Sequence, residues 1–184
     1  MTNYKKILSN IIESFLKDRY RNAKNKKVSY KEYCNLKDKQ KQYSGDEDII
    51  VTPVLLDILR ILGYESSINI IQQVEKKGDK PDFRTIKTNL FILDAKSTNM
   101  DISSKGKNLK TPFNQITRYL ISLKGYEYGI LFNLVKFEFF KRVYSEDGSI
   151  KVELMNDKTL NLLRLNELYE NDELETSKEY ETFK

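Results

Sequence analysis

Two aspartates and a lysine are the residues in this chain best suited to chemistry. Asp82 follows a proline, Asp94 comes twelve positions later after four apolar residues, and Lys96 follows two positions further on. A hard cation such as Mg²⁺ takes oxygen ligands and keeps some of its waters. It lowers the pKa of a bound water, and a neighbouring lysine orients or deprotonates that water or stabilises developing charge. These residue types therefore predict phosphodiester hydrolysis with Mg²⁺, for which Mn²⁺ is the expected substitute.

The composition excludes several other kinds of chemistry. Histidine is absent, and Cys34 is the single cysteine. Ser-His-Asp and Cys-His catalysis, His-ligated zinc, histidine-dependent nucleases, thiolate zinc sites and disulfide frameworks are therefore excluded. The chain also lacks a long apolar run and a signal-peptide pattern, so we expect a cytoplasmic protein without membrane contact.

A predicted hairpin positions the two aspartates. Residues 83–87 and 90–96 are expected to form strands on either side of Thr88, and the second strand begins with an apolar run typical of a strand buried on both faces. A turn about Thr88 places Asp82 and Asp94 directly opposite each other, with Cβ atoms about 5 Å apart. The two carboxylates would then hold one divalent cation between them.

Alternation along the second strand puts Lys96 on the same face as Asp94 and turns Ala95 to the other face. The alternative for Asp94 is a strand-end salt bridge with Lys96. A second acid-x-Lys sequence at residues 75–77 has no apolar run before it and is interpreted as solvated charge. Glu47 heads a predicted helix and is a candidate third carboxylate; the alternative is a first-turn acid that favours the helix dipole.

Other side chains compete for roles at the site or support it. Gln115 and Tyr119 are four residues apart on a predicted helix, so they share one face. For the tyrosine, the alternative is core packing. Three other acids compete for the role of third carboxylate: Asp46, Asp48 and Glu13.

Hydrophobic periodicity predicts the elements that carry these residues. Helices are expected over 4–23, 29–43, 111–124 and 158–170. A further helix is expected to begin after a cap at 44–48 and to end at Leu62, with a kink or a late start at Pro53. Strands are expected over 68–74, 83–87, 90–96, 128–134 and 136–144, with 150–154 as a further candidate strand and 97–110 as a polar loop. This order predicts an α/β protein with a mixed central β-sheet flanked by helices.

The charge distribution divides the chain into three parts. Residues 1–45 form a basic N-terminal arm, expected to be helical and packed on the core, with twelve Lys/Arg and four Asp/Glu. Residues 46–170 form the expected core, and residues 171–184 a frayed acidic tail. A basic arm is typical of nucleic-acid binding, and the alternative is a solvated helix face.

The motifs together resemble the nuclease domain of PD-(D/E)xK restriction enzymes. The similarity is greatest to the N-terminal nuclease region of type I restriction motor subunits and of single-chain type IIG or type ISP enzymes. It covers roughly residues 46–142. The matching text is, in chain order, Glu47, Pro53-Val54-Leu55-Leu56, Leu62-Gly63-Tyr64, Pro81-Asp82-Phe83, Ile92-Leu93-Asp94-Ala95-Lys96, Gln115-Ile116-Thr117-Arg118-Tyr119 and Tyr128-Gly129-Ile130-Leu131-Phe132-Asn133.

The resemblance implies a restriction-endonuclease-like fold and an Mg²⁺-dependent endonuclease that acts on double-stranded DNA. Asp82, Asp94 and the carbonyl of Ala95 are the implied metal ligands. Glu47 is implied to hold the metal directly or through water. Lys96 is the implied catalytic lysine.

The resemblance gives Gln115 and Tyr119 the roles of steadying the site or touching the DNA backbone. The chain departs from the family at two places. Asp94 stands where the family often has Glu, which the chemistry tolerates. The family commonly reads Thr-Asn-Gly after its Gly-Ile-Leu strand, whereas this chain reads Phe-Asn-Leu over 132–134, which leaves the role of Asn133 open.

The expected function is the DNA-cleavage domain of a restriction-modification enzyme. Basic side chains in residues 17–41 and in the loop over 105–110 are expected to contact phosphates. Recognition and translocation would lie in motor, methyltransferase or specificity domains or subunits, since the chain has no phosphate loop or methyltransferase motif. The alternatives are a non-catalytic nucleic-acid-binding module on the same fold, a standalone repair nuclease or junction resolvase, and a structural protein with a basic arm.

Overall fold

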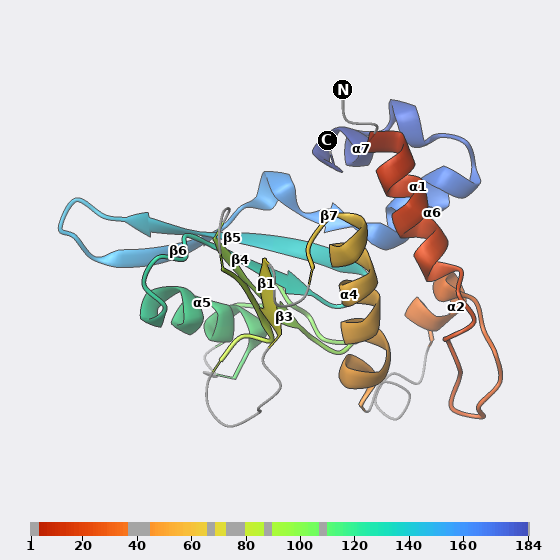
Figure 1. Ribbon diagram of the computed structural model, residues 1–184, viewed down its shortest axis with the longest axis horizontal. Helices are drawn as coiled ribbons and strands as arrows, with labels where there is room; N and C mark the ends of the chain where they lie inside the picture. Colours follow the sequence, from red (N-terminus) through yellow and green to blue (C-terminus); the bar gives the residue numbers. More distant parts are fainter. Residues whose placement is uncertain are drawn as a thin grey trace.

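The computed structural model describes residues 4–36, 45–65, 69–72, 80–86, 90–106 and 110–183. A mixed seven-stranded sheet with helices on both faces lies at its centre, which confirms the predicted α/β class (Figure 1). The strands are β1 (Ile70–Gln72), β2 (Phe83–Thr85), β3 (Phe91–Ala95), β4 (Tyr128–Phe132), β5 (Lys136–Tyr144), β6 (Ile150–Leu154) and β7 (Leu160–Asn161).

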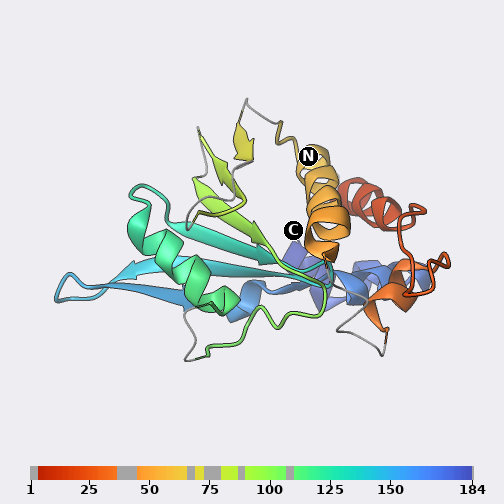
Figure 2. The ribbon, with the colours of Figure 1, turned by 90° about the horizontal axis from the view of Figure 1, so that it is seen from below.

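The strand order is β1-β2-β3-β4-β5-β6, with β7 paired to β5. All neighbours are antiparallel except β3 and β4, which are parallel. A parallel pair needs a crossover connection, and α5 (Pro112–Ser122) provides it. The β5–β6 hairpin projects past α5, away from α1 and α4 (Figure 1 and Figure 2).

Local sequence fixes where α5 begins and how closely it packs. The Thr111 side chain accepts a hydrogen bond from the Asn114 backbone N–H at 3.4 Å, as an N-cap residue does. Proline at position 112 suits the first helical turn. A Cβ atom on Gly129 of β4 would lie 2.7 Å from Ile116 Cγ1, so the missing side chain allows α5 to lie close against the sheet.

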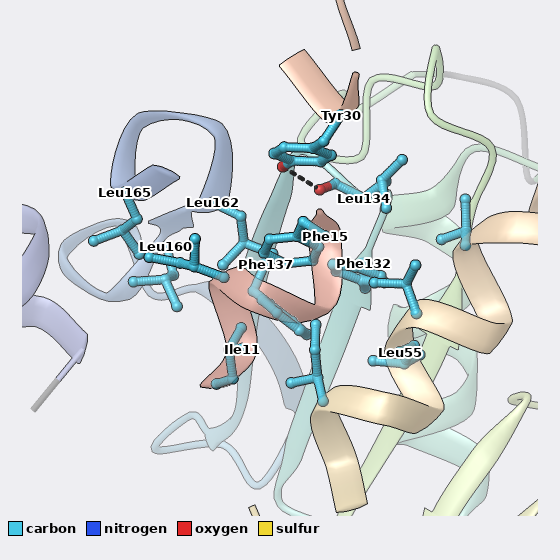
Figure 3. Packing of buried hydrophobic residues seen from close by; sticks show 14 of the residues in the cluster. Ile11, Phe15, Tyr30, Leu55, Phe132, Leu134, Phe137, Leu160, Leu162 and Leu165 are labelled. Carbon is cyan, nitrogen blue, oxygen red and sulfur yellow. Dashed lines mark hydrogen bonds between the residues drawn. The ribbon is translucent and has the colours of Figure 1, made fainter. Parts of the chain in front are cut away.

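The opposite face of the sheet carries the larger hydrophobic cluster. Most of its residues come from α1 (Tyr4–Phe15), α4 (Thr52–Ile61), β3, β4, β5 and α6 (Leu162–Glu170). Figure 3 shows side chains from α1, α4 and α6 meeting those of β4 and β5. The Tyr30 hydroxyl donates to the Leu134 carbonyl at 2.9 Å and ties the N-terminal region to the β4–β5 turn.

A π-helical turn precedes α4. This turn, η1, spans Glu47–Val51, and the Thr52 backbone N–H bonds to the Glu47 carbonyl five residues back. Pro53 is the second residue of α4, and the turn before it is π-helical rather than α-helical. The helix therefore does not begin late at the proline; its hydrogen-bond pattern changes there instead.

The N-terminal helices are shorter than predicted. The helix expected over 4–23 ends at Phe15, and residues 21 and 27 form an isolated antiparallel bridge instead. The apolar spacing stops near Phe15, and Lys17 and Arg19 leave the helix to pair with Asp57 of α4. The helix expected over 29–43 is α2 (Tyr30–Cys34), and residues 37–43 lie outside the described residues.

The C-terminal region also differs from expectation. The helix predicted from residue 158 begins at 162, after the short helix η2 (Asn156–Lys158) and β7. The expectation of a frayed acidic tail is wrong: η3 (Leu174–Thr176) and α7 (Lys178–Phe183) bury Leu174 and Tyr180 in the larger cluster. Within the described residues, every helix is too short or too polar to cross a lipid bilayer.

Candidate active site

The β2–β3 pair has the register that the sequence predicts. Phe83 lies opposite Leu93 and Arg84 lies opposite Ile92. The same register, continued by one position, puts residues 82 and 94 opposite each other. The predicted turn itself, residues 87–89, lies outside the described residues.

Asp82 and Ala95 are joined directly. The Ala95 backbone N–H donates to Asp82 Oδ2 at 2.7 Å, which holds the aspartate at the end of β3. The Ala95 side chain is buried in the larger cluster, so it points away from the α5 side as predicted. The role of the Ala95 carbonyl as a metal ligand stays a prediction.

Asp94 lies on the face of the sheet that α5 covers. It alternates with Ile92, which belongs to the cluster formed with α5, and its neighbour on β4 is Leu131 of the same cluster. Asp94 is 2% exposed. A carboxylate in such a place is costly unless a positive charge or a donor accompanies it.

Lys96 provides that positive charge. Its ammonium forms an ion pair with Asp94 Oδ2, and its backbone N–H donates to the Phe132 carbonyl at 2.8 Å, which extends the parallel pairing. The salt bridge considered as the alternative for Asp94 is therefore present. It does not exclude a catalytic role, because the same lysine lies beside further acids.

The pKa values of this pair reflect how deeply it is buried. Burial raises the pKa of Asp94 to about 7, with the charge of Asp82 acting in the same direction and that of Lys96 against it. Burial alone would lower the pKa of Lys96, but the charges of Asp94, Glu47 and Asp82 together raise it. Lys96 is therefore a firmly charged ammonium at neutral pH.

Glu47 belongs to the same electrostatic group. Burial raises its pKa, the charge of Asp82 adds to this effect, and Lys96 opposes it. The π-helical turn sets this glutamate at the entry to α4, and such turns are frequent at functional sites. Of the competing acids, Asp48 and Glu13 are exposed.

Asp46 is buried but serves a different contact. Its Oδ2 accepts hydrogen bonds from the Tyr33 hydroxyl at 3.2 Å and the Thr98 backbone N–H at 3.3 Å. Asp46 therefore links α2 to the segment that follows Lys96. Asp46 thus stabilises the backbone around the site, whereas Glu47 interacts electrostatically with Lys96.

The two helix residues named from the sequence lie on the same side of the sheet as Asp94. Tyr119 is 5% exposed, with its ring in the cluster that contains Ile92. Core packing, the alternative for Tyr119, is thus part of its role. Gln115 is half-buried one turn earlier on α5.

A second polar group on this face was not found from the sequence. Glu138 of β5 lies across from Leu131, which is itself across from Asp94, so all three share a face. Lys136 Nζ lies 2.6 Å from Glu138 Oε1 and 2.6 Å from Ser103 Oγ. Alternation along β5 predicts that Lys136 and Glu138 share a face, but not that they hold the loop after β3.

Asn133 has a structural task. Its Oδ1 accepts the backbone N–H groups of Val135 at 3.3 Å and Lys136 at 3.1 Å, and its amide donates to the Met100 carbonyl at 2.9 Å. Leu134 follows with φ 70°, in the left-handed region that glycine adopts most easily. Glycine is also the residue that the PD-(D/E)xK pattern commonly has at this position. Asn133 therefore holds the β4–β5 turn against the loop after β3.

The basic N-terminal arm is partly neutralised within the molecule. Lys17 and Arg19 pair with Asp57 at 3.3 and 2.8 Å. Lys31 lies 3.1 Å from Glu167 of α6, and Lys5 pairs with a glutamate of the C-terminal segment. These side chains are committed to acids, which favours the solvated, structural interpretation for them.

Comparisons of the chain with models of protein families, with curated proteins and with solved structures find no match. The chemistry of the site follows from its own atoms. Asp82 and Asp94 offer hard oxygen donors beside a charged lysine and a third acid. Within the described part of the chain, no three acids or cysteines are grouped as a ready-made metal site.

Proposed function

We propose that this chain is a metal-dependent endonuclease that hydrolyses DNA phosphodiesters at Asp82, Asp94 and Lys96. One observation supports the proposal above all others: the β2–β3 register brings two aspartates face to face, with a buried lysine ion-paired to the second. Glu47 adds a third acid whose pKa responds to both Lys96 and Asp82. A structural salt bridge needs one acid for one lysine, whereas the pKa of Lys96 is raised by its ion-pair partner Asp94 and by the charges of two further acids, Glu47 and Asp82.

The donor set fits a divalent cation such as Mg²⁺. Asp82 and Asp94 would hold it, with Glu47 bound directly or through water. Mg²⁺ is commonly bound by one or two carboxylates together with waters and substrate phosphates, so a cage of three acids is not required. The raised pKa values of Asp94 and Glu47 measure the cost of keeping buried carboxylates ionised, a cost that a bound cation would remove.

When bound, the cation would lower the pKa of a water and neutralise charge on the phosphate. The protein's own part falls mainly to Lys96. Its raised pKa keeps it protonated, so it acts as a hydrogen-bond donor and positive charge toward the phosphate oxygens rather than as a base. The Ala95 N–H holds the Asp82 carboxylate at the end of β3, where it would meet the cation.

The order of elements supports the finer assignment to a restriction-endonuclease-like fold. Glu47 precedes α4, the antiparallel β2–β3 pair carries the aspartates, and α5 crosses over to the parallel strand β4. On this proposal the substrate is double-stranded DNA. Motor, methyltransferase or specificity domains or subunits of a restriction enzyme would supply target choice.

A plasmid-cutting assay tests the proposal. Supercoiled DNA is incubated with the protein in Mg²⁺, in Mn²⁺ and in EDTA, beside Lys96→Ala and Asp82→Asn. We expect cutting in either metal, none in EDTA, and a loss of at least about a hundredfold in both variants, because each removes a preorganised group at the site.

Lys151→Ala is the matched control, because Lys151 is an exposed lysine on β6. It should cut like the unaltered protein, and circular dichroism should show that all variants are folded. An inactive unaltered protein, or a Lys96→Ala protein that cuts at the normal rate from the same purification, overturns the proposal.

A non-catalytic nucleic-acid-binding module is the second candidate. It is favoured by the Lys96–Asp94 ion pair and by the lack, within the described residues, of three grouped metal-binding side chains. This candidate predicts DNA binding that is the same in EDTA and in Mg²⁺, with no cutting in any condition. The plasmid assay and a binding assay together separate the two.

A further inference from the structure

Among the residues that the structure describes, an arginine next to the proposed site has a buried side-chain nitrogen without a hydrogen-bond partner. Arg84 is the middle residue of β2 and lies directly opposite Ile92, so its side chain is on the same face as Asp94. It is half-buried, and its Nε is buried without a hydrogen-bond partner. Within the described residues, no carboxylate lies in ion-pair contact with it.

This arrangement is costly for the protein alone. A guanidinium carries five N–H donors and stays charged, so burying part of it unpaired costs free energy. Asp94 is a diagonal neighbour of Arg84 across the β2–β3 pair. The backbones of such neighbours are typically about 7–8 Å apart, which a side chain as long as arginine can span. The ion pair of Asp94 is nevertheless with Lys96 and not with Arg84.

Arg84 and Lys96 flank the acids along the strand direction. Arg84 lies opposite residue 92, Asp94 comes next on the same face, and Lys96 follows. The face therefore reads cation, acid, cation in steps of two residues. Guanidinium groups match phosphate oxygens with paired hydrogen bonds, which an ammonium cannot do.

We propose that Arg84 binds a backbone phosphate of the DNA strand being cut, on the side of the carboxylates away from Lys96. This inference rests on the proposed function and adds to it the direction in which the strand crosses the site, from β2 residue 84 toward the end of β3. The part of the guanidinium beyond the buried Nε would donate to the phosphate. Ordinary affinity, and not the chemical step, is the property that Arg84 supplies.

The test is the salt dependence of DNA binding in EDTA, where no cutting occurs. Anisotropy of a short fluorescein-labelled duplex gives the Kd at several potassium chloride concentrations. Loss of one phosphate contact should lower the slope of log Kd against log salt by about 0.9. We expect this for Arg84→Gln, with binding weaker by roughly tenfold at the lowest salt, whereas Arg84→Lys keeps the slope.

Arg60→Gln is the matched control, since Arg60 is an exposed arginine of α4 on the other side of the sheet. Its slope should stay at the unaltered value. The inference is overturned if Arg84→Gln keeps both slope and Kd, or if Arg60→Gln lowers the slope equally. If Arg84→Gln has a lowered Tm, Arg84→Met replaces it, and the inference then requires that Arg84→Met lowers the slope while Arg84→Lys keeps it.

The two proposals fail in different ways. If the unaltered protein binds no duplex, the proposed function fails and this inference with it. If it binds and cuts DNA while Arg84→Gln behaves normally, only this inference fails.

Discussion

Glu138 is a buried carboxylate on β5, two strands away from Asp94 on β3. Its side chain is 3% exposed, and it accepts from Ser103 and Lys136. Removing its charge leaves the lysine half-buried without an ionic partner. Breaking such a buried contact costs more than a surface pair, because the remaining charge is poorly hydrated.

We therefore expect Glu138→Gln to lower the free energy of unfolding by about 1–3 kcal/mol, measured by urea denaturation. Glu153→Gln, an exposed glutamate of β6, should change it by less than about 0.5 kcal/mol. Equal effects of the two substitutions would mean that the Glu138–Lys136–Ser103 contact contributes nothing to stability.

The site residues that sequence could predict are those linked by alternation and register. A turn centred on Thr88 was enough to place residues 82 and 94 opposite each other, because a strand has a fixed period of two. Which side chains meet across elements decides the ion pair of Lys96 with Asp94 and the hydrogen bond from Thr98 to Asp46. It also decides that, in the described part of the chain, Arg84 Nε has no hydrogen-bond partner. No spacing along the chain encodes those choices.

Helix α5 packs close to β4 because Gly129 of that strand has no side chain. At Gly129, a methyl group would press on Ile116 Cγ1 at 2.7 Å and lie 3.0 Å from Leu120 Cδ1. Gly129→Ala should therefore shift α5 and lower the free energy of unfolding by about 1–3 kcal/mol, the usual cost of overpacking.

A double-mutant cycle with Ile116→Ala tests this cause. The cost of Gly129→Ala should fall by about 1 kcal/mol when Ile116 is already truncated, because the clash is gone. Strictly additive costs would show that the glycine matters for another reason. Thermal or urea unfolding of the four proteins measures it.

At the scale of elements, long periodic segments were predicted well and their ends were not. β5 and β6 have the predicted bounds, and α5 and the hairpin strands differ by a residue or two. The first helix ends eight residues early because Lys17 and Arg19 bind Asp57 of a distant helix. Tertiary pairing of this kind overrides local propensity, and a single segment carries no sign of it.

The whole molecule joins its two charged ends. Lys5 pairs with Glu175, Lys31 pairs with Glu167, and the rings of Tyr4 and Phe183 meet edge to face, with α1 and α7 close together in Figure 1. The acidic segment therefore packs against the basic one. The buried residues Leu174 and Tyr180, rather than the charges of the segment, should provide most of its contribution to the free energy of unfolding.

We expect deletion of residues 171–184 to lower the free energy of unfolding by at least about 3 kcal/mol, since each buried apolar side chain contributes about 1.5–3 kcal/mol. Glu175→Gln, which removes an exposed ion pair and keeps the packing, should have little effect. Both are measured by urea denaturation. A truncated protein as stable as the full chain would show that Leu174 and Tyr180 are dispensable.

One shared core receives side chains from residue 8 to residue 180, and it also supports α4, whose entry carries Glu47. The aspartates and the lysine precede α6 and α7 in the chain, so during synthesis they emerge before these helices can close over α1. We expect the fold around Glu47 to be complete only when α6 and α7 have packed against α1.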